Sequence, residues 1–189
     1  MNKTGFYIII VFIIAVFGCR ETTDKSKSSM KNPGNIYSAD KDFLNRYTET
    51  IELKKGESTL LIVPEWQGRV MTSTCEGDNG FSFGWINYKL ISSGDTLAHM
   101  NPYGGEERLW LGPEGGQYAL FFKKGDPFEF EYWQTPPLLD TEEFDIDSLS
   151  DTEVVFSKKG ELTNYSGHNF SFHIAVSYTH LTLPTKRIV

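Results

Sequence analysis

The sequence predicts an all-β fold, an antiparallel β-sandwich, in a single domain. Aromatic residues make up 14% of the 189-residue chain and there are 17 glycines, a composition that favours strands and tight turns over helices. Short β-prone runs recur along the chain with turn residues between them, as in antiparallel sheets. The sequence contains no heptads and no internal repeats. Without its N-terminal leader and tether, the chain is long enough for one domain.

Three strands begin the predicted domain. The β-prone runs are TETIEL (48–53), STLLIV (58–63) and GRVMTSTC (68–75). Turn residues at 54–57 and 64–68 separate these runs, so we expect antiparallel neighbours. Between 82 and 92, Trp85, Ile86, Lys89 and Leu90 lie at helical spacing, which predicts one short helix before Gly94.

The rest of the predicted domain is also β-rich. Residues 128–133 alternate apolar and acidic side chains, a pattern typical of a half-exposed strand, and two prolines follow at 136 and 137. The acidic stretch 140–151 is expected to be a loop. Further strands are predicted at 153–156, 161–165 and 170–176.

The most informative segment is NPYGGEERLWLGPEGGQYALFF, residues 101–122, which combines carboxylates, an arginine, a tryptophan and five glycines. In an extended strand Glu106, Arg108 and Trp110 share one face, and the leucines between them point the other way. Neither solubility nor core filling accounts for this mixture. The charged face therefore indicates a functional role.

The same segment predicts a β-hairpin. Residues 112–116 form a glycine-rich turn with Glu114 at its tip, and 117–122 returns as a second strand. Such a face suits a sugar, since carboxylate and guanidinium groups pair with hydroxyls while an apolar ring face stacks on tryptophan. The alternative, with equal weight, is a buried Glu106–Arg108 pair that serves only the fold.

The N-terminus predicts a lipoprotein. Residues 1–18 have the charged, apolar and small-residue zones of a secretory signal peptide, and the apolar run 6–17 is shorter than the ~20 residues of a membrane span. The end of this segment, VFGC, resembles a bacterial lipobox, which makes Cys19 the acylated first residue of the mature protein. The alternatives are a plain signal or an anchor helix. Residues 19–42, poor in apolar side chains, are expected to be a flexible tether.

The C-terminus looks foreign to the domain. Residues 178–189 resemble a translated sequencing adapter, and the alternating strand before them runs into a basic, proline-containing end without turn residues. We therefore expect 43–177 to be the incomplete N-terminal part of a larger β-sandwich. Strands that complete a site would then be missing.

Composition excludes several classes of function. Lys and Arg number 18 against 25 Asp and Glu; leaving out Lys3, Lys186 and Arg187 gives 15 against 25, a net charge of −10 that argues against a nucleic-acid partner. Cys75 has no partner once Cys19 is acylated, so we expect a small buried strand residue. The four histidines lack metal-site spacing. We expect neither a metal nor a cofactor.

Three segments together resemble a known family. They are PEWQGRVMTSTCEGDNGFSFGWINYKLISSG (64–94), NPYGGEERLWLGPEGG (101–116) and LTNYSGHNFSF (162–172). This pattern is similar to a Bacteroidota lipoprotein family of unknown function with a galactose-mutarotase-like supersandwich, over roughly 43–177. The resemblance implies a fold shared by aldose epimerases and by sugar-binding domains of glycoside hydrolases and polysaccharide lyases. It does not imply one reaction.

The resemblance carries over few residues. Mutarotases act with a histidine acid and a carboxylate base, and the base comes late in their chains, beyond the matched part. No catalytic pair is therefore assigned here. Arg69 resembles the arginine by which mutarotases hold substrate hydroxyls. His99 is the histidine nearest the central motif and is expected to be a structural residue more readily than an acid.

The leading hypothesis is a membrane-anchored lipoprotein that binds or processes carbohydrate on a concave sheet face. Eight side chains would line that face: Trp66, Arg69, His99, Asn101, Glu106, Arg108, Trp110 and Glu114. The alternatives are an aldose-epimerase-like enzyme, a glycosidase with two carboxylates, and a non-catalytic structural surface lipoprotein. Because Arg20, not an aspartate, follows Cys19, we expect the lipid anchor to hold the protein at the outer membrane.

Overall fold

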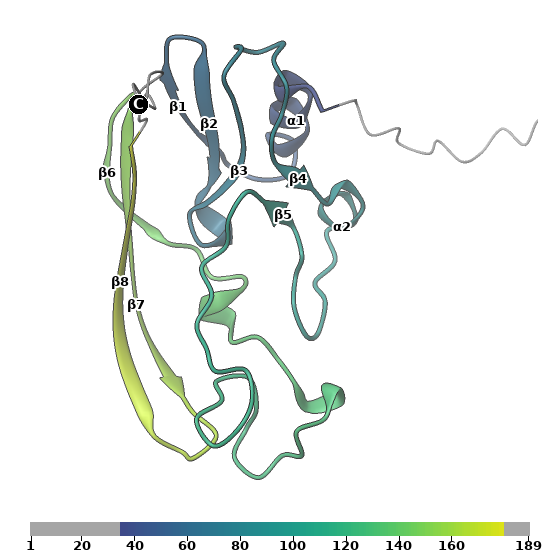
Figure 1. The fold of residues 1–189 in the computed structure, drawn as a ribbon, viewed down its shortest axis with the longest axis vertical. Coiled ribbons are helices and arrows are strands. Elements are labelled where there is room, and N and C mark those ends of the chain that lie inside the picture. The colour runs from purple at the N-terminus through teal and green to yellow at the C-terminus, as the bar shows by residue number, and fades with distance from the viewer. Residues whose placement is uncertain (1–34, 180–189) are drawn as a thin grey trace, which may run out of the picture. The chain divides into compact units, whose positions relative to one another are not determined.

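The structure is a computed structural model that describes residues 35–179. Its helices are α1 (Tyr37–Leu44) and α2 (Tyr88–Ser93), with 3-10 turns at Pro64–Trp66, Phe130–Tyr132 and Pro137–Leu139. Its strands are β1 (Ile51–Lys55), β2 (Ser58–Val63), β3 (Arg69–Thr74), β4 (Trp85–Ile86), β5 (Gly104–Gly105), β6 (Asp145–Leu149), β7 (Glu153–Thr163) and β8 (Asn169–Thr179). Within the described range they form three antiparallel sheets, β1-β2-β3, β4-β5 and β6-β7-β8 (Figure 1). The predicted all-β, antiparallel class is confirmed.

The first sheet forms where the sequence predicts it. β1 and β2 pair from Ile51↔Ile62 to Lys55↔Ser58, and β3 pairs with β2 across a bulge. Alternation along the strands gives the sheet two apolar faces. One face packs on α1 and α2 through Leu61, Val63 and Met71. The other packs on the β6–β8 sheet through Leu53, Ile62 and Val70, together with Val154 and Phe156 of β7.

Helix α1 begins inside the range expected to be tether, 19–42, and ends two residues beyond it. Tyr37 is fully buried, and its hydroxyl donates to Glu52 Oε1 at 2.9 Å. Lys41 Nζ reaches the other oxygen of Glu52 at 2.6 Å. These contacts fasten the helix to β1, so residues from 37 onward belong to the folded part. Cys19 and residues 19–34 lie outside the described residues.

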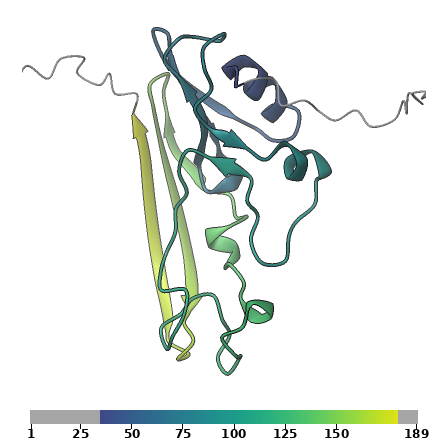
Figure 2. The same cartoon turned by 45° about the vertical axis from the view of Figure 1, so that its right-hand side comes forward.

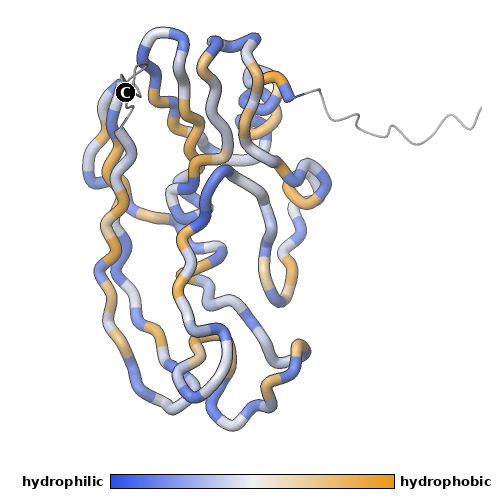
Figure 3. The backbone as a smooth tube through the Cα atoms, in the orientation of Figure 1, coloured by the Kyte–Doolittle hydropathy of each residue, from blue (hydrophilic) through white to orange (hydrophobic). Residues whose placement is uncertain are grey.

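The β6–β8 sheet is dominated by two long strands. β7 and β8 pair without interruption from Glu153↔Thr179 to Thr163↔Asn169, so the two strands predicted at 153–156 and 161–165 are one. Apolar and polar residues follow one another along this sheet (Figure 3). β6 lies within the expected acidic loop, because Ile146 and Leu149 pair with β7 despite the aspartates at 145 and 147.

Two residues of the expected foreign tail belong to this sheet. Tyr178 and Thr179 pair with Val154 and Glu153, and the Tyr178 hydroxyl donates to Glu107 Oε1 at 2.9 Å. Burial, and then the Glu107 carboxylate, raises the pKa of Tyr178. Residue 178 is therefore part of the packed structure. Residues 180–189 lie outside the described residues.

The predicted hairpin at 106–122 does not form. The Glu106 N–H donates to the carbonyl of Val70 at 2.9 Å, and the Val70 N–H donates to Glu107 Oε1 at 3.0 Å. The start of the motif thus bonds to β3 instead of to residues 117–122, which have no strand structure. The strand predicted at 128–133 is also wrong, since Phe130–Tyr132 is a 3-10 turn.

The irregular segment 106–140 packs on the β7–β8 part of the last sheet (Figure 2). Phe121, Leu138 and Leu139 form a third core cluster with Leu162 of β7. The approach is close at Gly160, where a Cβ would lie 1.9 Å from Cδ1, the far end of the Leu138 side chain. The bare backbone at Gly160 therefore lets the Leu138 side chain lie directly against β7.

Two smaller expectations meet different outcomes. The predicted short helix is present as α2, capped by Asn87, whose Oδ1 accepts from the Leu90 N–H at 3.2 Å, and ended by Gly94. Trp85, expected within it, lies in β4. Cys75 was expected to be buried and is exposed, because β3 ends one residue earlier.

Candidate functional site

The central motif is held by a buried carboxylate that the sequence analysis missed. Asp140 Oδ2 accepts from Asn101 Nδ2 at 2.8 Å, and both of its oxygens accept from the Asn101 N–H. Asp140 Oδ1 accepts from Arg108 Nη2 at 2.7 Å. The same Nη2 donates to the carbonyl of Leu139 at 3.0 Å. Asp140 thus ties the two parts of the motif together. Asp140 directly follows two apolar residues, 138 and 139, and an acid buried at such a position indicates a charged partner.

Arg69 is also committed to the interior. Its side chain is 2% exposed, and it donates to the carbonyl of Gly104 and to Gln67 Oε1, both at 2.9 Å. Burial, and then the neighbouring Arg108, lowers the pKa of Arg69 to about 10. The guanidinium therefore remains protonated at neutral pH, and its bonds serve the fold.

The tryptophans of the predicted face have different surroundings. Trp66 is 5% exposed and stacks on Tyr103 at 4.2 Å between ring centroids, so it belongs to the core. Trp110 is half-buried, and its Nε1 donates to Glu114 Oε1 at 2.8 Å. The Arg108 guanidinium lies 4.6 Å from the centre of the Trp110 ring, close enough for a cation–π contact.

The remaining predicted residues lie near the surface. His99 donates from Nδ1 to the carbonyl of Trp133, and its ring lies 4.4 Å from that of Phe130. Glu106 and Glu114 are exposed, and the Glu106 carboxylate forms no hydrogen bond or ion pair within residues 35–179. The structure thus places four of the eight, Trp66, Arg69, Asn101 and Arg108, in internal packing or bonding.

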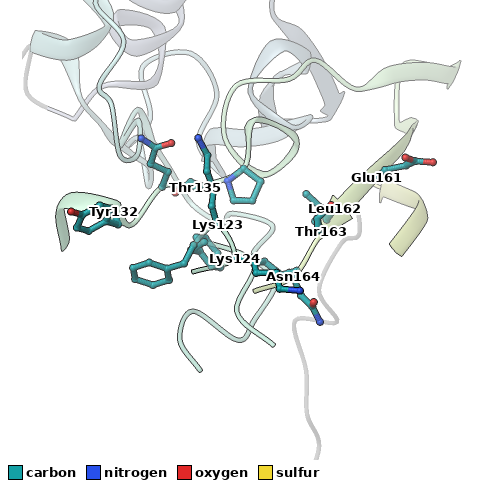
Figure 4. Close-up of a pocket in the computed structure, with 13 residues that line it drawn as sticks. Lys123, Lys124, Tyr132, Thr135, Glu161, Leu162, Thr163 and Asn164 are labelled. Carbon is teal, nitrogen blue, oxygen red and sulfur yellow. The ribbon is translucent and has the colours of Figure 1, made fainter. Parts of the chain in front are cut away.

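A cavity of about 320 Å³ lies beside the motif and contains none of those eight side chains (Figure 4). Its apolar walls come from Leu120, Phe121, Phe122, Pro136 and Leu162. Its polar groups come from Lys123, Lys124, Tyr132, Gln134, Thr135, Glu161, Thr163 and Asn164. The volume lies in the range of small-molecule sites.

The cavity adjoins the motif through a stack of aromatic rings. Phe121, one of its walls, lies 5.0 Å from the Trp110 ring and 5.4 Å from the Trp133 ring. Trp133 in turn lies 6.3 Å from Phe130. The motif residue Trp110 therefore supports the wall of the cavity from behind.

Two buried polar residues line the cavity. Thr135 is 8% exposed, and its Oγ1, which solvent does not reach, has no hydrogen-bond partner within the described part of the chain. Such a buried hydroxyl costs about 1–3 kcal/mol of stability. Asn164, 2% exposed, also lines the cavity and holds the turn before β8 by accepting from the His168 N–H at 2.9 Å.

The described residues contain neither a cluster of metal-binding side chains nor a helix that could span a membrane. Between residues 35 and 179, no group of three or more His, Cys, Asp or Glu side chains is placed to hold a metal ion. Over the same range, none of the helices has the length and apolar character needed to cross a membrane.

Fold and site define an all-β protein with a polar-rimmed cavity beside a buried arginine–aspartate network. Residues 35–182 match the model of a family of unknown function (DUF6786), and the chain belongs to that family. No curated protein matches the chain, and no solved structure does. The expected membership of an uncharacterised family is thus confirmed. The matched range also includes α1 and the end of β8.

Proposed function

We propose that this protein binds carbohydrate in the 320 Å³ cavity between residues 120–124, 134–136 and the end of β7. The observation that carries the proposal is the set of amide, hydroxyl and ammonium side chains that surround the apolar and aromatic walls of one cavity. A ligand hydroxyl both donates and accepts, so it pairs with such groups where an apolar ligand would not. The cavity replaces the eight-residue sheet face as the ligand site.

The walls of the cavity also suit a sugar. Pyranose rings present apolar C–H faces that pack on aromatic rings, and their hydroxyls pair with amides at the ring edge. Phe122 and Tyr132 supply aromatic surface, whereas Gln134 and Asn164 supply amides. Tyr132 is 44% exposed, which leaves part of its ring open to a ligand.

The lining favours binding over catalysis. Glu161 is the one carboxylate among the lining residues of this cavity, and no histidine lines it. A two-carboxylate glycosidase needs a second acid, and an epimerase mechanism needs a histidine opposite a carboxylate. A recognition site needs neither, so it is the simpler assignment.

The proposal includes the fold type and the membrane anchor. Two antiparallel sheets share a core cluster, which supports a β-sandwich of the galactose-mutarotase-like type. The lipobox ending at Cys19 supports acylation, and Arg20 in place of an aspartate supports an outer-membrane location. Mass spectrometry of the mature protein tests the anchor, and an unmodified Cys19 would overturn it.

Replacing Gln134 with leucine tests the binding site. Leucine keeps much of the side-chain volume and removes the exposed amide, so we expect carbohydrate affinity to fall roughly tenfold while stability changes by less than about 0.5 kcal/mol. Glycan-array screening of the full chain followed by calorimetry measures this. Gln117→Leu is the matched control, since Gln117 is also exposed but is not among the residues that line the cavity. Equal affinity of Gln134→Leu and wild type would refute the site.

A further inference from the structure

The cavity has a positively charged side that binding of a neutral sugar does not require. We propose that its ligand is an acidic sugar, and that Lys123 and Lys124 bind the carboxylate or sulfate group of that sugar. This inference rests on the proposed carbohydrate site and specifies the chemical class of its ligand. Both lysines line the cavity, and neither forms an ion pair with any acid within residues 35–179.

Lys123 and Lys124 differ from the other lysines in their place and not in lacking an ion pair. Lys41 pairs with Glu52 at 2.6 Å and Lys158 pairs with Glu142 at 2.9 Å, whereas the other lysines of residues 35–179 form no ion pair. Lys123 and Lys124 are the two cationic side chains that line this cavity. Their like charges favour an anionic group in its ligand.

The single acid of the cavity does not neutralise the lysines. Glu161 lines the same cavity, but it forms no ion pair within the described residues and lies apart from the lysines in Figure 4. The lining groups therefore sum to a net positive charge. A carboxylate or sulfate would bind at the lysines and away from Glu161, which gives an acidic sugar a defined orientation.

The Lys124 side chain is exposed and lies beside the turn at Gly167. This side chain runs past Gly167, because a Cβ built at Gly167 would lie 3.4 Å from Lys124 Cδ and 3.5 Å from its Nζ. Gly167 has φ of 88°, in the turn that Asn164 holds. The same turn therefore supports one lysine and contributes one amide to the cavity.

The polar groups beside the lysines distinguish an acidic sugar from a simple anion. A free inorganic ion needs only the ammonium groups, whereas Gln134, Thr163 and Asn164 add two amides and a hydroxyl to the same cavity. Those groups match the hydroxyls on the remainder of a sugar ring. Charge and hydroxyl recognition together specify an acidic sugar.

The test compares three probes on the full chain by calorimetry: a galacturonate tetramer, its fully methyl-esterified form, and a sulfated galactan tetramer. Tight binding of one acidic probe, with the neutral ester at least tenfold weaker, supports the proposal. Loss of affinity on esterification identifies the carboxylate as the bound group, whereas a preference for the sulfated probe identifies the sulfate. Affinity should also fall as salt is raised.

Variants assign the charge to the lysines. Lys123→Gln and Lys124→Gln should each weaken binding of the acidic probe roughly tenfold, whereas Lys55→Gln, the same change at the exposed end of β1, should not. Unchanged melting temperatures confirm that the variants fold. Equal affinity for the ester and the acid overturns the acidic-ligand inference and leaves the carbohydrate site standing. Failure of all three probes, and of a neutral glycan array, overturns both.

Discussion

The two large sheets and the segment from residue 101 to residue 140 are stabilised by different interactions. In β1–β3 and β6–β8, backbone pairs run from strand to strand, and Leu53, Ile62 and Phe156 fill the space between the sheets. In 101–140 the structure describes one short strand, β5, and two 3-10 turns, while Asp140 and the aromatic stack hold the chain. Regular pairing makes a scaffold, whereas side-chain networks shape a cavity.

The comparison also predicts which substitutions should affect stability alone and which should affect the cavity as well. Buried aliphatic and aromatic side chains in the sheets contribute through burial alone, so their loss should cost stability and little else. Side chains in the irregular segment have polar partners and are partly open to solvent, so their loss should affect the cavity as well.

Phe156→Ala should produce the largest loss of stability. Phe156 is fully buried between the sheets, and truncation of such a ring costs about 3–5 kcal/mol. Urea unfolding of the full chain measures the change. Phe130→Ala, at a ring 67% exposed, is the control and should stay within about 0.5 kcal/mol. Similar losses in both variants would remove the distinction between the two regions.

Asp140→Ala should destabilise the irregular segment by about 3 kcal/mol. The change leaves the Arg108 guanidinium without its carboxylate and the Asn101 N–H without an acceptor. Hydrogen exchange should then show faster opening of 101–140 than of β7. Asp151→Ala, in the exposed turn between β6 and β7, is the control. Uniform exchange across the chain would show that the segment is not a separate unit.

Trp110→Ala should cost about 2 kcal/mol, because the ring is half-buried and its main partners are Phe121 and Arg108. Loss of this support should also weaken ligand binding at the neighbouring cavity wall. Trp110→Phe keeps the stacking ring and removes only the hydrogen bond to Glu114, so it should retain most of the binding. A loss as large as that of Phe156→Ala would make Trp110 a core residue of the fold.

The smallest expected effect is a pH dependence of stability that comes from Asp40, a buried residue of α1. Burial raises the pKa of Asp40, although the hydrogen bond from Ser82 lowers it. The folded state therefore favours protonated Asp40, and this contribution is full below the unfolded pKa of about 3.9 and is lost as pH rises through the raised folded pKa. Asp40→Asn should remove this dependence, which melting temperatures from pH 4 to pH 8 would show. An identical pH profile in the variant would contradict the assignment.

The sequence predicts the scaffold better than the site. The strands at 51–55, 58–63 and 69–74 follow from local alternation and short turns, which a chain carries without its context. The hairpin at 106–122 is wrong because the backbone of Glu106 bonds to Val70, a residue far away in the chain. No local pattern encodes a choice of partner at that distance.

The candidate site could not be predicted from local sequence either. Arg108 and Asn101 stand out in sequence by their composition, but their partner Asp140 lies more than thirty residues further along. Thr135, Gln134 and the two lysines belong to no motif, and packing of Phe121, Leu138 and Leu139 on Leu162 brings their segment to β7. That both lysines line one cavity cannot be predicted until the residues near them in space are known.

By itself, then, the sequence determined the antiparallel strands of an all-β domain, because alternation and turn chemistry act within a few residues. It also determined that residues 101–116 carry charge and aromatic rings that solubility does not explain. Tertiary structure alone decided that those groups turn inward to Asp140 and Phe121. It also decided that the polar-lined cavity forms beside them, because burial and ion pairing depend on residues distant in sequence.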